Sequence, residues 1–456
     1  MKTAAHKRQK GSISIIVAVS LVALLGILGL AIDSGLGYMI RARLDAATDG
    51  AVVAAGQAVT RGNNQSEQTT NATQAANAFF SANYPAGFLG STATGGTPSV
   101  VFDSKGTVTI GMSAQAQVPV TFMQTLGFKV LNVSASSQVI RKTLDMAFVI
   151  DTTGSMATDP TEPPIVRANA ISFLNSFDIT NDRVALMHFA FGTIIDTPFK
   201  SDSSRGFERA TMTSQIQKYS FSGSTNSSEA FWNARNQLNQ LQNPSSLRVI
   251  VFFSDGAPNS FASAFTFANQ ANPCNNPVGT NKVVGTMASP DSNGKMTGLW
   301  HADQLQTQLN PLCYNSDLAK NSSKFIPSLP AFYNAHNPTD TTFPIITNSP
   351  RVVTAAVTYQ NVNRASRNLL EAMAADARNN NIYVFTLGLG QPLVQPAGPD
   401  NELGQDVLKC MANTPDSLPR CYNSKQPVGV YCHAATPADL APCFSQLASQ
   451  ILRISQ

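Results

Sequence analysis

The feature that most constrains this chain is a run of 22 residues, Gly11 to Ile32, that holds no Asp, Glu, Lys or Arg. Ile, Val, Leu and Ala dominate the run, and a helix of this length rises about 1.5 Å per residue, enough to span the roughly 30 Å of a bilayer core. Four basic residues precede it, so the positive-inside rule places the amino terminus in the cytoplasm. The sequence therefore predicts membrane contact through residues 11–32.

The residues after this run help to separate a retained anchor from a cleaved secretory signal. The apolar region of a signal peptide has about 7–15 residues, whereas Asp33 follows this longer run with no clear small-x-small cleavage site. Arg41 and Arg43 place two positive charges after the apolar run, which argues weakly against a cytoplasmic amino terminus. We therefore expect residues 1–34 to be a cytoplasmic tip and an uncleaved anchor, with the body in the periplasm or outside the cell.

Charge is scarce in the rest of the chain. Charged residues make up 13% of the sequence, against about 25% in an average soluble domain. The net charge of +4 arises in residues 1–43, which hold six basic residues and one acid, while the remainder holds 25 basic and 26 acidic residues. The composition therefore argues against a nucleic-acid partner and a long coiled coil, and 43% hydrophobic residues argue against a disordered chain.

An apolar stripe continues the helix beyond the membrane run. Its members recur every three or four positions with no Pro between them: Leu36, Ile40, Leu44, Ala47, Ala51, Ala55 and Ala58. Small residues on such a stripe permit close packing against a partner helix. The alternative is that the stripe packs on the chain's own body.

A short basic stretch, then GSISIIVAVSLVALLGILGLAID, then GYMIRARLDAATDGAVVAAG, resembles the TadE/TadG-like family of Flp (Tad) pilus assembly proteins. The resemblance covers about 45 residues and includes the stretch from Arg41 to Ala55. It implies a bacterial envelope protein that takes part in pilus assembly. Pseudopilins of that system carry a Glu shortly after the cleaved Gly, and none follows Gly11 here, so prepilin-type processing is not expected.

The segment after the helix divides into a linker and a small β module. Residues 35–97 are expected to hold the extended helix and a linker rich in Asn, Gln, Thr, Gly and Ser, with a short helix near 72–83. Residues 98–143 are expected to form a β-rich stalk, because apolar and polar residues alternate from Val108 to Val118. A turn at 103–106 would pair that strand with 100–102.

From residue 144 the pattern changes to alternating strands and helices. Nearly continuous apolar runs of strand length predict strands buried on both faces at 146–150, 184–189, 249–253 and 382–387. Helical periodicity lies between them, above all at 165–177 and 361–378. We therefore predict an α/β fold with a doubly wound, mostly parallel sheet over residues 144–456, whose ligands would bind at the carboxyl ends of the strands.

Two predicted strands end in acidic residues, and hydroxyl side chains follow nearby. Asp151 ends one strand and is followed by Thr153 and Ser155, while Asp255 follows another strand and Thr225 lies in a loop between them in the sequence. Carboxylate and hydroxyl oxygens suit a hard dication such as Mg²⁺. Because only two of these five groups are anionic, the ion would keep positive charge and could accept a carboxylate from a protein ligand.

This arrangement resembles the metal-ion-dependent adhesion site of von Willebrand factor A domains, which have a Rossmann-like fold. The resemblance implies that Asp151, Thr153 and Ser155 are ligands from the first loop, Thr225 from the second and Asp255 from the third. It implies Mg²⁺ as the cofactor, with Mn²⁺ or Ca²⁺ as alternatives. The more frequent family pattern has Ser where this chain has Thr153. The alternative is a von Willebrand A fold that has lost its metal.

The span 257–350 has no counterpart in a minimal domain of this type. It leaves the sheet directly after Asp255, so it begins beside the predicted metal site. We expect it to cover the site and shape the choice of ligand, and the alternative is a loop that packs sideways.

All six cysteines follow residue 270, and an even number outside the cytoplasm favours disulfides over zinc. Cys274 with Cys313 is the favoured pair within the insertion. The remaining four would pair locally, with 410–421 and 432–443 as one arrangement, although six cysteines allow 15 pairings.

The sequence therefore predicts a membrane-anchored, extracytoplasmic pilus assembly or adhesion protein that binds a protein ligand through a metal ion. An envelope von Willebrand A protein without a pilus role is the second hypothesis. A metallohydrolase is the third, but no general base is evident near Asp151 and Asp255, so we do not expect an enzyme. The oligomeric state is left open.

Overall fold

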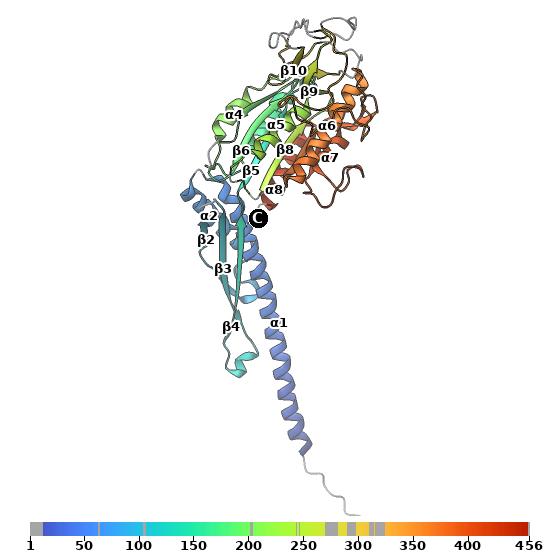
Figure 1. Cartoon of the computed structure of the whole chain (residues 1–456). Helices are drawn as coiled ribbons and strands as arrows, with labels where there is room; N and C mark the ends of the chain where they lie inside the picture. Colours follow the sequence, from blue (N-terminus) through green and yellow to red (C-terminus); the bar gives the residue numbers. More distant parts are fainter. Residues whose placement is uncertain are drawn as a thin grey trace, which may run out of the picture. The chain divides into compact units, whose positions relative to one another are not determined.

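The structure is a computed structural model of the whole chain, and it describes residues 12–62, 64–103, 106–200, 204–242, 244–245, 247–269, 281–289, 298–309, 314 and 324–454. The chain divides into two compact units, Met1–Arg141 and Lys142–Gln456 (Figure 1). Each unit has its own hydrophobic core, and each is described by itself below.

Helix α1, Ser12–Ala58, dominates the first unit. From Ile13 to Leu28 its residues are exposed on every side, although they are almost all apolar. This is the one stretch in the described residues that is long and apolar enough to cross a membrane. Apolar side chains exposed all around a helix are what a lipid-facing segment requires.

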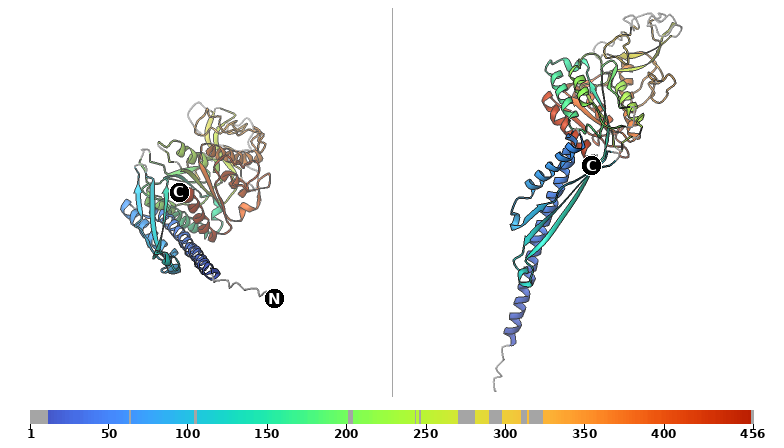
Figure 2. Two further views of the ribbon diagram at one scale, coloured as in Figure 1. Left: turned by 90° about the horizontal axis from the view of Figure 1, so that it is seen from below. Right: turned by 90° about the vertical axis from the view of Figure 1, so that its left-hand side faces the viewer.

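Burial on α1 begins at Gly29 and continues along one face. Figure 1 shows β3 and β4 running beside α1, and Figure 2 shows the same from the side. Ile40, Leu44 and Ala47 are fully or almost fully buried in the core of this unit, as are Ala51 and Ala55 further along the stripe. The interpretation that the stripe packs on the chain's own body is therefore confirmed for these residues.

A second helix, α2, spans Gln65–Asn83 and packs on the same core through Ala72, Ala76 and Phe80. The sequence analysis expected a linker here with a shorter helix. Its weak periodicity hid a helix that is capped by Asn64, whose side chain accepts the Glu67 N–H at 2.9 Å. Short 3₁₀ segments follow α1 and α2 at Val59–Arg61 and Phe88–Gly90.

The sheet of the first unit is antiparallel, with β3 at its centre. The alternating residues of β3 from Val108 to Val118 are buried, as their pattern predicts. The pairing of residues 100–102 with this strand is confirmed, and the long β3–β4 hairpin turns through a short 3₁₀ segment, η3. The bounds are β1 Thr92–Gly95, β2 Ser99–Phe102, β3 Val108–Pro119, η3 Met123–Leu126 and β4 Val130–Arg141.

The second unit is built on a six-stranded sheet in the order β14-β11-β8-β5-β6-β7. Its neighbouring strands are parallel except for β7, which pairs antiparallel with β6. The predicted mostly parallel, doubly wound α/β fold is confirmed. The strands are β5 Leu144–Asp151, β6 Arg183–Phe189, β7 Thr193–Thr197, β8 Leu247–Ser254, β11 Tyr383–Leu389 and β14 Tyr431–Ala434.

Helices cover both faces of this sheet (Figure 1). Alternate side chains of β5 enter different cores: Ala147 and Val149 join one, and Met146 and Phe148 join the other. The first core also holds α5 Ser227–Asn239, α6 Tyr359–Asn379 and α7 Gly404–Ala412. The second holds α3 Glu162–Leu174, α4 Arg209–Gln217 and α8 Leu440–Ile454.

Helix α8 begins at Leu440 and holds Pro442 in its first turn. Proline in a first turn removes an N–H that has no helical acceptor, so it costs no hydrogen bond there. A capping box between Thr436 and Asp439 precedes the helix. The smaller elements of this unit are η4 Gly154–Ala157, η5 Gln391–Val394, β12 Pro396–Ala397, β13 Glu402–Leu403 and η6 Pro437–Asp439.

The predicted insertion, 257–350, contains an antiparallel hairpin of β9, Ser260–Thr266, and β10, Lys282–Ala288. Its apolar side chains, including Phe261, Phe265 and Tyr333, belong to the same core as α5 and α6. The insertion therefore extends the hydrophobic core of the domain. It also begins directly after the end of β8.

Two disulfides are present in the described residues, Cys410–Cys421 and Cys432–Cys443. Both are the local pairs that the sequence analysis favoured, and zinc as the alternative for these four cysteines is wrong. The predicted pair of Cys274 with Cys313 lies outside the described residues.

Candidate metal centre

The candidate site lies where β5 and β8 end side by side. Asp151 is the last residue of β5, and Asp255 directly follows β8. The parallel register pairs Ile150 with Phe253, so the two carboxylates leave the sheet at the same edge. Parallel strands place their carboxyl ends together, which is why acids far apart in the sequence meet here.

The hydroxyl groups of the first loop join the two acids in one network. Ser155 Oγ donates to Asp255 Oδ1 at 2.8 Å, and Thr153 Oγ1 lies 3.1 Å from Ser155 Oγ. Thr153 Oγ1 is also 3.5 Å from Asp255 Oδ1, and its backbone N–H donates to Asp151 Oδ1 at 2.8 Å. Four of the five predicted ligands are thus in direct contact with at least one other.

Thr225 comes from the loop before α5. A methyl group added at Gly256 would lie 3.5 Å from Thr225 Oγ1 and 4.0 Å from Ser155 Oγ, so both hydroxyls border this glycine. Gly154 N–H donates to the Gly223 carbonyl at 3.0 Å, which joins the first and second loops. Gly223 has φ +98°, and a Cβ added there would lie 3.0–3.2 Å from Ala190 and Phe191, so a side chain would be both strained and crowded.

Burial raises the pKa values of the two carboxyl groups. Asp151 is 0% exposed and Asp255 is 4% exposed. Burial raises the pKa of Asp151 to about 6, against the hydrogen bonds from Ser254 and Thr153 that lower it. Burial also raises the pKa of Asp255 well above its usual range, and the nearby negative charge of Asp151 adds to that rise. In the part of the chain that the structure describes, no Lys, Arg or His forms an ion pair with either acid.

Two residues that the sequence analysis did not select hold the site in place. Ser254 Oγ donates to Asp151 Oδ2 at 2.5 Å, because the β5–β8 register sets Ser254 beside Asp151. Asn259 holds the second loop from both sides: its side chain accepts the Thr225 N–H at 2.9 Å, and its own N–H donates to the Thr225 carbonyl at 3.2 Å. A hydroxyl preceding a strand-end acid could have indicated Ser254; no local signal indicated Asn259.

The residues present fit a divalent cation. They offer two carboxylates and three hydroxyls, all hard oxygen donors, and Mg²⁺ prefers such donors with several waters retained. The carboxylates are buried with raised pKa values, and no basic side chain among the described residues forms an ion pair with them, so a bound dication would supply the missing positive charge.

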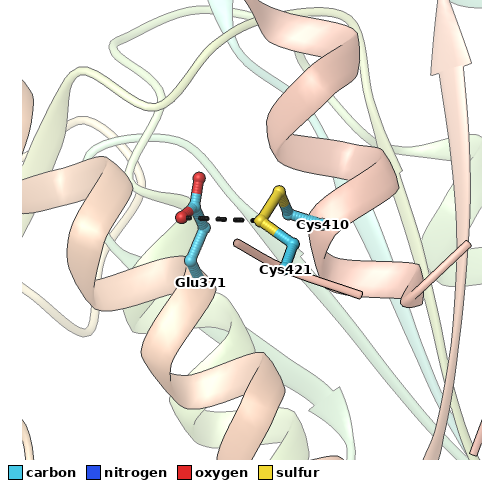
Figure 3. Close-up of side chains that lie close together, drawn as sticks. All are labelled: Glu371, Cys410 and Cys421. Carbon is cyan, nitrogen blue, oxygen red and sulfur yellow. Dashed lines mark hydrogen bonds between the residues drawn. A yellow bond between two sulfur atoms is a disulfide. The ribbon is translucent and has the colours of Figure 1, made fainter. Parts of the chain in front are cut away.

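A second cluster in this unit has a different character. Glu371 lies beside Cys410 and Cys421, and Figure 3 shows its carboxylate facing the disulfide, with Cys421 Sγ 4.0 Å from Glu371 Oε2. Both sulfurs are committed to the disulfide, and Glu371 accepts hydrogen bonds from Arg351 and Arg420. A cavity of about 390 Å³ adjoins this cluster, but its charges are already paired and it offers no free ligand set.

Two family models match parts of this chain. The family model for the von Willebrand factor type A domain matches residues 146–257, which contain all five predicted ligands. The family model for Flp pilus-assembly TadE/G-like proteins matches residues 11–58, a range that contains the whole of α1. The chain contains both domains. A search of curated protein sequences returned no match.

Among solved structures the chain is similar to the vWF domain of the type V pili tip protein Mfa5 from Porphyromonas gingivalis, at 16% identity and a TM-score of 0.39, over 70% of this chain and 98% of that one. It is also similar to the PilB minor pilin from Streptococcus sanguinis, at 12% identity and a TM-score of 0.37, over 81% and 80%. For proximal thread matrix protein 1 from the mussel byssus the identity is 11% and the TM-score 0.32, over 68% of this chain and 46% of that one. This chain thus spans less than half of the mussel protein, and similarities this distant transfer no function.

A Tad segment joined to a von Willebrand A domain indicates a pilus-associated adhesion or assembly protein. The long apolar α1, which coincides with the Tad segment, indicates anchoring in the cell envelope.

Proposed function

We propose that this chain is anchored in the bacterial membrane by α1 and that its von Willebrand A domain binds a carboxylate of a protein ligand through a divalent cation. The ligand would be a pilus subunit, another assembly component or a surface protein. The observation that carries the proposal is the cluster of the buried Asp151 and Asp255 with three hydroxyls at the strand ends, where Ser155 is exposed, on a chain that also has a Tad segment.

The ligand set explains why such a site would recognise an acid. Asp151, Thr153, Ser155, Thr225 and Asp255 would hold Mg²⁺, or Mn²⁺ or Ca²⁺, with only two negative charges among them. The bound ion would keep positive character and attract a further carboxylate. The low dielectric of the buried site strengthens that attraction.

Orientation follows from the charges that flank the apolar run. Four basic residues precede residue 11, so the amino terminus would face the cytoplasm and the body would lie in the periplasm or outside the cell. The two disulfides, Cys410–Cys421 and Cys432–Cys443, support an oxidising compartment for the body.

The insertion is proposed to shape the choice of ligand. Asn259, near its start, holds Thr225, and Trp300 stacks on Phe191 with ring centroids 4.1 Å apart. Asn226, beside Thr225, donates to Thr286 Oγ1 of β10 at 3.0 Å. These contacts connect the insertion to the second loop of the site, so a change in one would alter the other.

Binding by the full chain in detergent tests the proposal. A fragment that starts at residue 60 would remove the buried face of α1 from its own core, so the anchor is retained. Immobilised protein would be incubated with purified pilus filaments, in Mg²⁺ and in chelator. We expect retention in Mg²⁺ only, and loss of retention in Asp151→Ala.

The matched control is Asp159→Ala, which removes an exposed acid a few residues from the site. It should bind as the parent does. Retention of filaments by Asp151→Ala, or by the parent in chelator, would refute the metal mechanism. Binding to envelope proteins but never to filaments would favour the second candidate, an envelope von Willebrand A protein without a pilus role.

A further inference from the structure

The tip of the β3–β4 hairpin, residues 120–130, is held against α1 where its apolar run ends. Asp33 is 1% exposed, and its carboxylate accepts the backbone N–H groups of Thr121, Phe122 and Met123 at 3.1, 2.9 and 2.7 Å. The first acid after the membrane run is therefore bound by the hairpin tip, which satisfies a charge that burial would otherwise penalise.

The contact at Gly29 places the tip at the level of the membrane run. A methyl group added there would overlap Phe122 Cβ, so the phenylalanine lies directly against the helix backbone. Gly29 precedes Asp33 by one helical turn, which is about 6 Å along the axis. Since Gly29 belongs to the uncharged run that ends at Ile32, Phe122 lies beside a segment predicted to be in the bilayer.

The composition of the tip suits a membrane interface and not water. Phe122, Phe128 and Val130 are 43%, 55% and 46% exposed. Lys129 is exposed as well, and it is the only charged residue between Gly106 and Ile140. Turns that face water are usually built from Gly, Asn, Asp, Pro and Ser. Exposed aromatic residues beside one lysine are typical of membrane interfaces, where the ammonium group reaches the phosphates.

We propose that the hairpin tip inserts into the bilayer interface beside α1, on the side opposite the amino terminus, as a second and non-spanning membrane contact. Phe122, Phe128 and Val130 would enter the level of the lipid glycerol and upper acyl chains, and Lys129 would meet the phosphate groups. The inference rests on the membrane anchoring in the proposed function. A helix and a hairpin inserted together would fix the tilt and rotation of the first unit at the membrane surface.

Quenching by brominated lipid tests this contact in the full chain. Phe128→Trp places a fluorophore at the tip, and Val101→Trp is the matched control, because Val101 is similarly exposed at 56% but lies on β2, which pairs with the far end of β3. Both variants and the parent would be reconstituted into vesicles of phosphatidylcholine with or without brominated acyl chains. Subtracting the parent removes the emission of the two native tryptophans.

We expect the added emission of Phe128→Trp to be blue-shifted and to fall by about half or more in brominated vesicles, whereas that of Val101→Trp should not change. Flotation of the parent with the vesicles reports the anchor independently. If the parent floats but the tip variant is quenched no more than the control, the hairpin inference is overturned and the anchor stands. If the parent does not float, anchoring and the hairpin inference both fail.

A photoreactive residue at position 128 gives a second measurement in cells. Crosslinking to lipid supports the inference, and crosslinking to a protein alone would overturn it.

Discussion

Removing divalent cations tests the candidate metal centre through the electrostatics of its own carboxylates. Asp151 and Asp255 are buried, and the described residues place no cationic side chain in an ion pair with them. Without a dication, each acid is therefore easier to protonate in the folded protein than in the unfolded chain. The free energy of unfolding must then fall as the pH rises and the two carboxyl groups ionise.

The sign and size follow from Asp151. Its pKa rises from 3.8 in the unfolded chain to about 6 in the folded protein. The folded state thus holds the proton more tightly, and this contribution to stability is present below pH 4 and lost as the pH rises to about 6. A shift of about two units corresponds to about 3 kcal/mol. Asp255 shifts in the same direction.

Intrinsic fluorescence during urea unfolding provides the assay. Trp232 and Trp300 are the two tryptophans of the chain, and both lie in the second unit. Full-length protein in detergent would be unfolded at about pH 4 and pH 7, without divalent ions and with Mg²⁺. Asp151→Asn serves as the reference, because the difference from the parent cancels the titration of distant carboxylates.

Without divalent ions, the free energy of unfolding of the parent should fall between pH 4 and pH 7 by roughly 2 kcal/mol more than that of Asp151→Asn, because part of the contribution is already lost at pH 4. At pH 7, Mg²⁺ at about 100 times its dissociation constant should stabilise the parent by roughly 2.7 kcal/mol and leave the variant unchanged. Equal pH dependence in the two proteins, or equal stabilisation by Mg²⁺, would refute the reasoning.

Three further predictions concern the supports of the site and the fold. Ser254→Ala should weaken Mn²⁺ binding roughly 10- to 100-fold in calorimetric titration, because Asp151 loses the hydroxyl that orients it; unchanged affinity would contradict this role. Asp33→Ala should speed amide hydrogen exchange at residues 121–123, which lose their acceptor, while exchange in β2 should stay as it is. The Cys410–Cys421 disulfide closes a loop between cysteines 11 residues apart and so restricts the unfolded chain. A variant with Cys410→Ser and Cys421→Ser lacks this restriction and should lose roughly 3 kcal/mol of unfolding free energy. A loss near zero would show that the disulfide does not constrain the unfolded chain.

Much of the second unit could be predicted because its signals are local. The apolar runs that form β5, β6, β8 and β11 are continuous, since strands buried on both faces need apolar residues at every position. The five candidate ligands occur at or near strand and helix ends, where the order of strands brings them together. The two described disulfides pair cysteines only 11 residues apart.

Other features left no local signal. Helix α2 is rich in polar residues and has a narrow apolar face, so its packing depends on α1 and the sheet of the first unit. Asn259 can bind Thr225 only because the start of the insertion lies beside the second loop. The insertion is held there by its apolar side chains, which pack in the same core as α5 and α6.

The sequence by itself determined the membrane-length apolar run and the alternation of strands and helices, because each depends on residues close together in the chain. It also indicated the candidate oxygen ligands one loop at a time, because acids and hydroxyls follow the ends of predicted strands. Only the tertiary structure decided that the stripe on α1 faces the chain's own sheet, that Asp33 binds the hairpin tip, and that Ser254 and Asn259 hold Asp151 and Thr225. These contacts join residues far apart in the sequence, and their energy comes from burial and hydrogen-bond geometry that arise only when the elements pack.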